Sequence, residues 1–139
     1  MVEPAAFLAA SWRAMESTNA DQPYVLVVDD EEHITEMLAM GLGFNGFQVE
    51  RGASGRAAVD AFGRRRPDLV VLDVMLPDLD GFEVAKRVRQ GEGAGSHLPI
   101  IFLTARDATQ DKGEGLRLGS DDYVTKPFSI EELIERVRA

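Results

Sequence analysis

The stretch Pro67-Asp68-Leu69-Val70-Val71-Leu72-Asp73-Val74-Met75-Leu76-Pro77 decides how this chain folds. Its aliphatic run lies between two prolines and is typical of a strand buried on both faces, as in a parallel sheet. Pro77 closes the run too early for a helix. Because an unpaired buried charge is costly, we expect Asp73 at the carboxyl end of the strand, where open α/β sheets bind ligands. The alternative is that Asp73 only caps a turn.

The composition is that of an ordinary globular domain. The chain has 139 residues, of which 45% are hydrophobic and 28% charged, and this fits a single domain. The absence of cysteine excludes disulfides and thiolate metal sites and fits a cytoplasmic location. A net charge of −9 argues against nucleic-acid binding by this chain itself. No apolar run approaches the roughly 18 residues that span a bilayer, so no membrane contact is expected.

The two ends of the chain are expected to differ in structure from the domain between them. Residues 1–22 are Ala-rich and end in a polar, turn-forming stretch, so we expect a disordered extension ahead of a domain at 23–139. A docking segment that uses Phe7, Leu8 and Trp12 is the alternative. The last helix is predicted to begin near Ser129, and the sequence stops at Ala139, barely three turns later. We therefore expect a truncated last helix, cut from a longer protein, with a naturally short chain as the alternative.

Five apolar runs alternate with helical patterns along the domain. The runs cover 24–28, 47–50, 69–73, 98–103 and 121–125, and the helical patterns cover 31–42, 54–63, 82–88, 109–118 and the residues after 129. This order predicts an α/β fold of flavodoxin-like type, a doubly wound (βα)5 unit with a five-stranded parallel sheet in the order 2-1-3-4-5. The first helix should begin at Glu31 and Glu32 and turn Ile34, Met37, Leu38 and Leu42 inward.

Polar side chains interrupt this pattern at the strand ends. Asp29 and Asp30 follow the first strand, Asp73 ends the third, Thr104 ends the fourth and Lys126 follows the fifth. In a parallel sheet these ends share one edge, and the predicted order places strands one and three side by side. Each residue alone could be a cap or a surface charge, but five coincident strand-end positions favour one site.

Three carboxylates gathered in this way need a counter-charge. At an effective dielectric of 20, each pair about 4 Å apart costs roughly 4 kcal/mol, so one carboxylate takes up a proton or a cation binds. Oxygen ligands without His or Cys indicate Mg2+. Bound Mg2+ would bring a phosphate to Asp73, while Lys126 and Thr104 hold its outer oxygens.

Four stretches resemble the motifs of a two-component response-regulator receiver domain, namely Val27–Glu31, Leu72–Gly81, Leu103–Ala105 and Asp121–Phe128. The resemblance implies that Asp73 accepts a phosphoryl group from a sensor histidine kinase. It implies Mg2+, or Mn2+ in its place, bound by Asp30, Asp73 and the backbone carbonyl of Met75, with Asp29 acting mainly through water.

The resemblance also implies the parts of a switch. Thr104, the backbone of Ala105 and Lys126 would engage the phosphate, and Tyr123 would swing inward as Thr104 moves. The peptide bond between Lys126 and Pro127 would be cis, an isomer that proteins restrict almost entirely to X-Pro bonds. The chain would be a signalling switch rather than an enzyme, limited to Mg2+-dependent phosphoryl acceptance and self-dephosphorylation.

The stretch from Gly119 to Leu133 resembles the subfamily that carries a C-terminal winged-helix DNA-binding domain, which is absent here. Such regulators form homodimers through the fourth helix, fifth strand and last helix, so DNA contact would come from the missing domain. By position, Lys112 would pair with Glu132 and Asp122 with Arg136 across the two-fold axis. The expected dimer face consists of Lys112, Leu116, Asp121, Asp122, Glu132 and Arg136. Exposed helix charges of little individual value are the alternative interpretation.

Other functions share part of this pattern. A haloacid dehalogenase-type phosphatase also uses an aspartyl phosphate, a Thr or Ser, a Lys and Mg2+. It needs a second carboxylate two residues after the nucleophile, where this chain has Met75. A stand-alone receiver that acts through protein–protein contacts is the other alternative.

Overall fold

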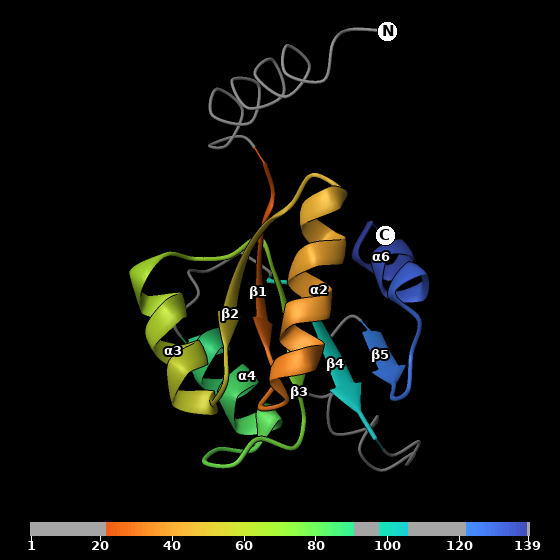
Figure 1. Cartoon of the computed structure of the whole chain (residues 1–139). Coiled ribbons are helices and arrows are strands. Elements are labelled where there is room, and N and C mark those ends of the chain that lie inside the picture. The colour runs from red at the N-terminus through yellow and green to blue at the C-terminus, as the bar shows by residue number, and fades with distance from the viewer. Residues whose placement is uncertain (1–21, 91–97, 106–121, 139) are drawn as a thin grey trace, which may run out of the picture.

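The computed structural model describes residues 22–90, 98–105 and 122–138, which form a parallel sheet with helices on both faces (Figure 1). The strands are β1 (Tyr24–Val28), β2 (Gln48–Gly52), β3 (Leu69–Asp73), β4 (Ile100–Thr104) and β5 (Asp122–Thr125), in the order β2-β1-β3-β4-β5. The helices in the described ranges are α2 (Glu32–Phe44), α3 (Gly55–Arg64), α4 (Gly81–Gln90) and α6 (Ile130–Arg138). The predicted fold class and strand order are confirmed.

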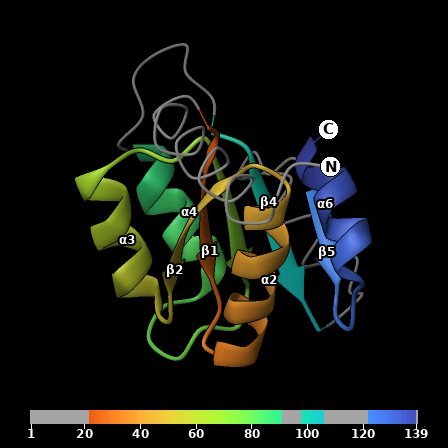
Figure 2. The same ribbon diagram turned by 45° about the horizontal axis from the view of Figure 1, so that its top comes forward.

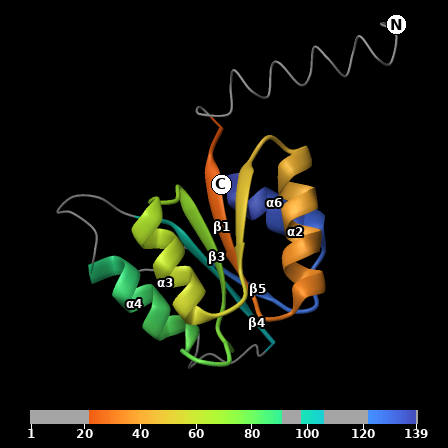
Figure 3. The same cartoon turned by 60° about the vertical axis from the view of Figure 1, so that its left-hand side comes forward.

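The helices form two layers with the sheet between them. Figure 3 shows α3 and α4 on one side of the sheet and α2 and α6 on the other. In β1, Leu26 and Val28 pack with the α3 and α4 side, whereas Val25 and Val27 pack with the α2 and α6 side. A strand covered on both faces must be apolar at every position, which explains the continuous runs in the sequence.

The strand register brings the polar strand ends to one edge of the sheet (Figure 2). Val28 of β1 lies beside Leu72 of β3, so the residues that follow them, Asp29 and Asp73, come at the same level of the sheet edge. On the other side of β3, Asp73 lies beside Leu103, and Thr104 of β4 lies beside Thr125 of β5. The pairing register of the strands, rather than a long loop, therefore brings the site residues together.

Helix α2 departs from its predicted face. Met37 was expected inward, but it is 40% exposed. The buried residues of α2 are Ile34, Thr35, Leu38 and Leu42. Adjacent helix residues point about 100° apart, and Met37 therefore lies at the edge of a buried face centred on Leu38. The prediction for Met37 is wrong, and the polar residue Thr35, on the other side of Leu38, is buried instead at 4% exposure.

Some boundaries also differ, and some predictions lie outside the described residues. Helix α2 continues to Phe44, and β2 covers Gln48–Gly52 rather than 47–50. The predicted helix at 109–118, residues 1–21, the loop at 91–97 and Ala139 all lie outside the described ranges. Within those ranges, no helix combines the length and apolar character needed to cross a bilayer.

The turn after β3 closes where α4 begins. The Gly81 N–H donates to the Val74 carbonyl oxygen over 2.8 Å. A Cβ at Gly81 would overlap the Asp73 carbonyl oxygen and lie 2.8 Å from Val74 Cα. Only glycine allows this approach of α4 to the end of β3.

We expect Gly81→Ala to lower the free energy of unfolding by about 1–3 kcal/mol, because backbone atoms that cannot move aside would have to shift. Urea denaturation measures this change. Gly63→Ala is the matched control, since a Cβ at Gly63 meets nothing within 4 Å and alanine is the better helix former. Equal stability of the two variants would contradict the steric argument.

Candidate functional site

Two buried carboxylates lie at the carboxyl edge of the sheet. Asp29 is 1% exposed and Asp73 is 3% exposed. The Glu31 N–H donates to Asp29 Oδ1 over 2.9 Å, and the Met75 N–H donates to Asp73 Oδ1 over 3.1 Å. Each aspartate is thus held through Oδ1 by the backbone that follows it.

Lys126 lies between these aspartates. Its Nζ is 2.8 Å from Asp29 Oδ2, 3.5 Å from Asp73 Oδ2 and 3.5 Å from Glu31 Oε1, and its side chain is 14% exposed. The Lys126 N–H donates to the Thr104 carbonyl oxygen over 2.7 Å, which anchors the residue to the end of β4. The Lys126–Pro127 peptide bond is cis, as the resemblance implied.

Glu31 belongs to the site, although sequence reasoning assigned it only to a helix start. It occupies the N-cap position of α2, but its side chain makes no capping hydrogen bond there. Its carboxylate instead contacts Lys126 and joins Asp29 and Asp30 in a group whose ligand oxygens lie within 4.8 Å of one another. The available signal was its position directly after the strand-end pair Asp29-Asp30.

The acidic group fits a hard cation such as Mg2+. The ammonium of Lys126 is within 4 Å of three carboxylates, those of Asp29, Glu31 and Asp73. One positive charge does not balance three negative ones, so a second cation would lower the electrostatic cost of this group. Asp30 is exposed to solvent, so its carboxylate can give up bound water and coordinate a cation instead. These all-oxygen donors are those that Mg2+ and Mn2+ prefer.

Asp73 and Lys126 influence each other's protonation. Burial raises the pKa of Asp73 to about 6, and the charge of Asp29 adds to this rise, while the Met75 N–H and Lys126 oppose it. Burial alone would lower the pKa of Lys126, but the close contact with Asp29 and the charges of Asp29, Asp73 and Glu31 outweigh it. The net pKa of Lys126 is raised, so the ammonium stays charged at neutral pH.

The remaining predicted site residues surround this centre. Thr104 is buried at 2% exposure, and Ala105 is exposed next to it. The Met75 side chain is 55% exposed. Tyr123 is partly buried, and its ring centroid lies 5.5 Å from that of Phe102 in the core under α4.

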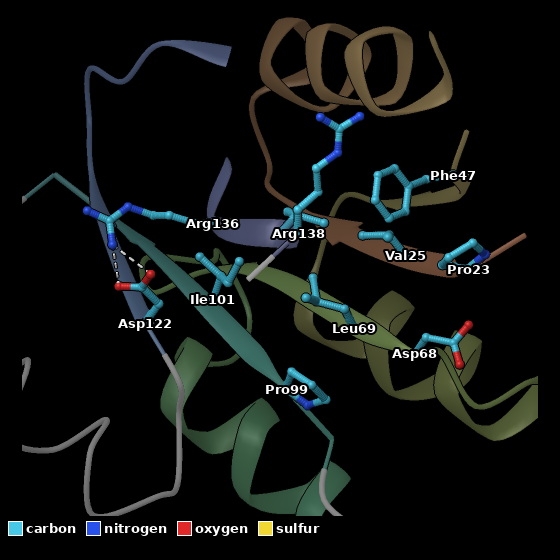
Figure 4. A pocket seen from close by; sticks show the side chains of 11 residues that line it. Pro23, Val25, Phe47, Asp68, Leu69, Pro99, Ile101, Asp122, Arg136 and Arg138 are labelled. Carbon is cyan, nitrogen blue, oxygen red and sulfur yellow. Dashed lines mark hydrogen bonds and ion pairs between the residues drawn. The ribbon is translucent and has the colours of Figure 1, made fainter. Parts of the chain in front are cut away.

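The expected dimer face is only partly described. Asp122 and Arg136 form two contacts of 2.6 and 2.7 Å within one chain, as Figure 4 shows, and Glu132 lies 3.6 Å from Arg136. Lys112, Leu116 and Asp121 lie outside the described residues. The pair expected across a two-fold axis is thus already made inside the chain.

A hollow of about 560 Å³ lies beside this ion pair, away from the acidic group. Val25, Leu69 and Ile101 line its floor near the starts of their strands (Figure 4). Its position at the amino-terminal edge of the sheet separates it from Asp73, which ends β3 at the other edge.

Comparison with known proteins identifies the family. A family model, the response regulator receiver domain, matches residues 25–138. The chain belongs to the response regulator receiver domain family. Members of this family are signalling proteins rather than classical enzymes.

Sequence relatives and solved structures similar to this chain are response regulators as well. The chain is 51% identical to the probable transcriptional regulatory protein TcrX of Mycobacterium tuberculosis, over 83% of this chain and 48% of that protein. It is 50% identical to the response regulator MprA of Mycolicibacterium vanbaalenii, with the same shares. The chain thus spans about half the length of these relatives.

Among solved structures, a Francisella response regulator 1452 receiver domain superimposes with a TM-score of 0.75 at 40% identity, covering 84% of this chain and 93% of that one. The chemotaxis protein CheY4 of Vibrio cholerae gives 0.79 at 33% identity, covering 84% and 97%. The BeF3-activated receiver domain of Klebsiella pneumoniae RstA gives 0.73 at 30% identity, covering 83% and 95%.

The raised pKa of Asp73 predicts a pH-dependent loss of stability. The pKa of this carboxyl group is about 6 in the folded protein and near 3.8 in the unfolded chain, so folding favours its protonated form. Its contribution to stability is complete below about pH 3.8 and is lost as the pH rises from there through about 6. Without added metal, we expect Asp73→Asn to raise the free energy of unfolding at pH 7.5 by about 1 kcal/mol after allowance for solvent screening.

This gain should shrink as the pH falls toward 4, and urea denaturation across that range measures it. Asp60→Asn is the control, because Asp60 is exposed on α3 and the substitution removes the same charge. A gain that does not vary with pH would contradict the titration argument.

Proposed function

We propose that this chain is a phosphoacceptor that takes a phosphoryl group onto Asp73 from a sensor histidine kinase in the presence of Mg2+. The observation that carries the proposal is the position of Asp73. Its Oδ2 lies 3.5 Å from Lys126 Nζ at the strand edge that also holds the acidic group. A buried carboxylate with a charged partner and cation ligands beside it suits phosphoryl acceptance.

In this reaction an oxygen of Asp73 attacks phosphorus, the P–N bond of the phosphohistidine breaks, and the imidazole leaves with that electron pair. Asp29, Asp30, Asp73 and the Met75 carbonyl would hold Mg2+, which neutralises charge on the phosphoryl oxygens when bound. Lys126 stabilises the same oxygens by an ion pair. The hydroxyl of Thr104 and the backbone of Ala105 contact the phosphate.

The deprotonated form of Asp73 is the nucleophile. Its pKa near 6 leaves most of the carboxyl ionised at neutral pH. Lys126 keeps its proton and so remains a cation beside the transferred group. The proposed reaction therefore needs no general base at Asp73, in contrast to reactions that must first activate a hydroxyl.

Transcriptional output is the proposed consequence. Two of the matching relatives, TcrX and TrcR of Mycobacterium tuberculosis, are named as transcriptional regulatory proteins, and each is about twice as long as its matched part. A DNA-binding output domain outside this chain would give that activity, because a charge of −9 disfavours DNA contact here. We place the protein in the cytoplasm, where a histidine kinase domain would reach it.

Phosphorylation would favour a homodimer through the face that contains β5 and α6. A phosphoryl group shifts an equilibrium only through contacts that differ between two states. Thr104 ends β4, the strand next to Asp73 of β3, and Tyr123 lies in the adjacent strand β5, so the proposed signal would pass through these two residues. Their movement would alter the surface that also holds Glu132 and Arg136.

Intact mass after incubation with acetyl phosphate and Mg2+ tests phosphoryl acceptance. We expect the wild-type chain to gain one phosphoryl group and Asp73→Asn to gain none, because the amide cannot form the acyl phosphate. Asp60→Asn is the matched control and should be modified like the wild type. A wild type that gains no mass, or an Asp73→Asn variant that does, would overturn the proposal.

Light scattering on the same samples tests the dimer. We expect phosphorylation to double the mass of the wild type, and Lys112→Glu to prevent this by placing like charges together. Combining Lys112→Glu with Glu132→Lys should restore the dimer, because the exchanged pair is complementary again. A double variant that stays monomeric would argue against the Lys112–Glu132 pairing.

A further inference from the structure

Asp78, in the turn that follows β3, binds the amino terminus of a helix that precedes it in the sequence. The Gly55 N–H donates to Asp78 Oδ1 over 2.8 Å, and the Arg56 N–H donates to Asp78 Oδ2 over 2.9 Å. Hydrogen bonds from the Arg56 and Gly55 N–H groups hold the pKa of Asp78 below its usual value, so the carboxylate is charged. The two carboxylate oxygens thus accept hydrogen bonds from the first two residues of α3.

This arrangement differs from an ordinary cap. The first N–H groups of a helix lack partners within it, and a preceding side chain usually supplies one. Here Ser54 Oγ already accepts from the Ala57 N–H over 3.1 Å. Asp78 adds two bonds from a turn 22 and 23 residues further along the chain. The bonds therefore join two separate segments, which the Ser54 cap does not.

The turn and the helix also meet without space between them. A Cβ at Gly55 would lie 2.6 Å from Leu79 Cβ and 3.0 Å from Val84 Cγ2. Real Cβ atoms do not approach that closely, so only glycine at position 55 lets the turn reach α3. In Figure 1, α3 begins at the same edge of the sheet at which β3 ends.

The last residue of β2, just before the connection to α3, holds the segment of the other buried aspartate. The Asp29 N–H donates to the Gly52 carbonyl oxygen over 3.1 Å. Only Ala53 and Ser54 separate Gly52 from Gly55, which binds Asp78. Residues 52–55 are therefore hydrogen-bonded to two segments. Gly52 binds the segment of Asp29, and Gly55 binds Asp78 in the turn that follows Asp73.

We propose that Asp78 is a positioning residue that, in addition to the β1–β3 register, fixes the turn after Asp73 relative to the segment of Asp29 through the start of α3. Asp78 itself binds no metal or phosphate. It holds the turn after Asp73 against α3 while Gly52 holds Asp29, so the two carboxylates stay in a fixed relation. The metal-binding part of this inference rests on the proposed function, since Asp29 and Asp73 are its proposed ligands.

The first test is Mg2+ affinity, measured by calorimetry on the unphosphorylated chain. We expect Asp78→Ala to weaken binding by about tenfold, as residues that orient metal ligands typically do. Asp78→Asn keeps one acceptor oxygen and should weaken binding less. Ser54→Ala removes a cap from the same helix without touching the turn. Asp60→Ala removes a charge from a hollow between α3 and α4 that Asp78 also lines. Both controls should bind Mg2+ like the wild type.

The second test uses amide hydrogen exchange in the metal-free protein and does not depend on the proposed function. In Asp78→Ala we expect exchange of the Met75 amide, which holds Asp73, to accelerate about fivefold. In Ser54→Ala, Met75 should exchange as in the wild type while Ala57 accelerates. Asp78→Asn supplies a milder variant if Asp78→Ala does not fold.

The outcomes separate the two proposals. If the wild-type chain binds no Mg2+, the proposed function fails, and Met75 exchange still decides the role of Asp78. If Asp78→Ala leaves Met75 exchange unchanged, the positioning role is overturned. The same holds if Ser54→Ala reduces Mg2+ affinity as much as Asp78→Ala, because the effect would then come from helix stability alone.

Discussion

The contact of Lys126 with Asp29 and Asp73 is the interaction on which the site depends. Two buried carboxylates at neighbouring strand ends repel each other, by roughly 4 kcal/mol at 4 Å and an effective dielectric of 20. A cation placed 2.8 Å from one and 3.5 Å from the other offsets this repulsion. Its position follows from β5, because the Lys126 N–H continues the pairing of that strand with β4 at Thr104. The sheet register and the local electrostatics therefore support each other.

Much of the fold could be predicted from sequence for one physical reason. Strands covered on both faces must be apolar at every position, so β1, β3 and β4 appear as unbroken runs whose ends are marked by polar residues. The alternation of these runs with helical patterns then leaves few topologies. The location of Asp29, Asp73 and Lys126 at one edge followed from the same reasoning.

The rest depends on contacts between distant segments. Nothing local in the sequence shows that α6 packs onto α2 at Gly41, where a Cβ would lie 2.6 Å from Ile130 Cγ1. The apolar spacing placed Met37 on the inner face of α2, whereas the structure buries Thr35 and leaves Met37 40% exposed. Glu31 and Asp78 were missed similarly, because a helix start and a turn are sufficient local explanations for acidic residues.

The pairing of Asp122 with Arg136 inside one chain has a consequence for assembly. If two copies exchanged these partners, each new intermolecular ion pair would replace an existing intramolecular one, and the number of ion pairs would stay the same. The exchange would then contribute little net free energy and little dependence on ionic strength. The ion pair would instead restrict how the two copies can be oriented, because arginine binds a carboxylate in only a few orientations. Such a pair selects how two copies are arranged, and the driving force for assembly must come from other contacts on that face.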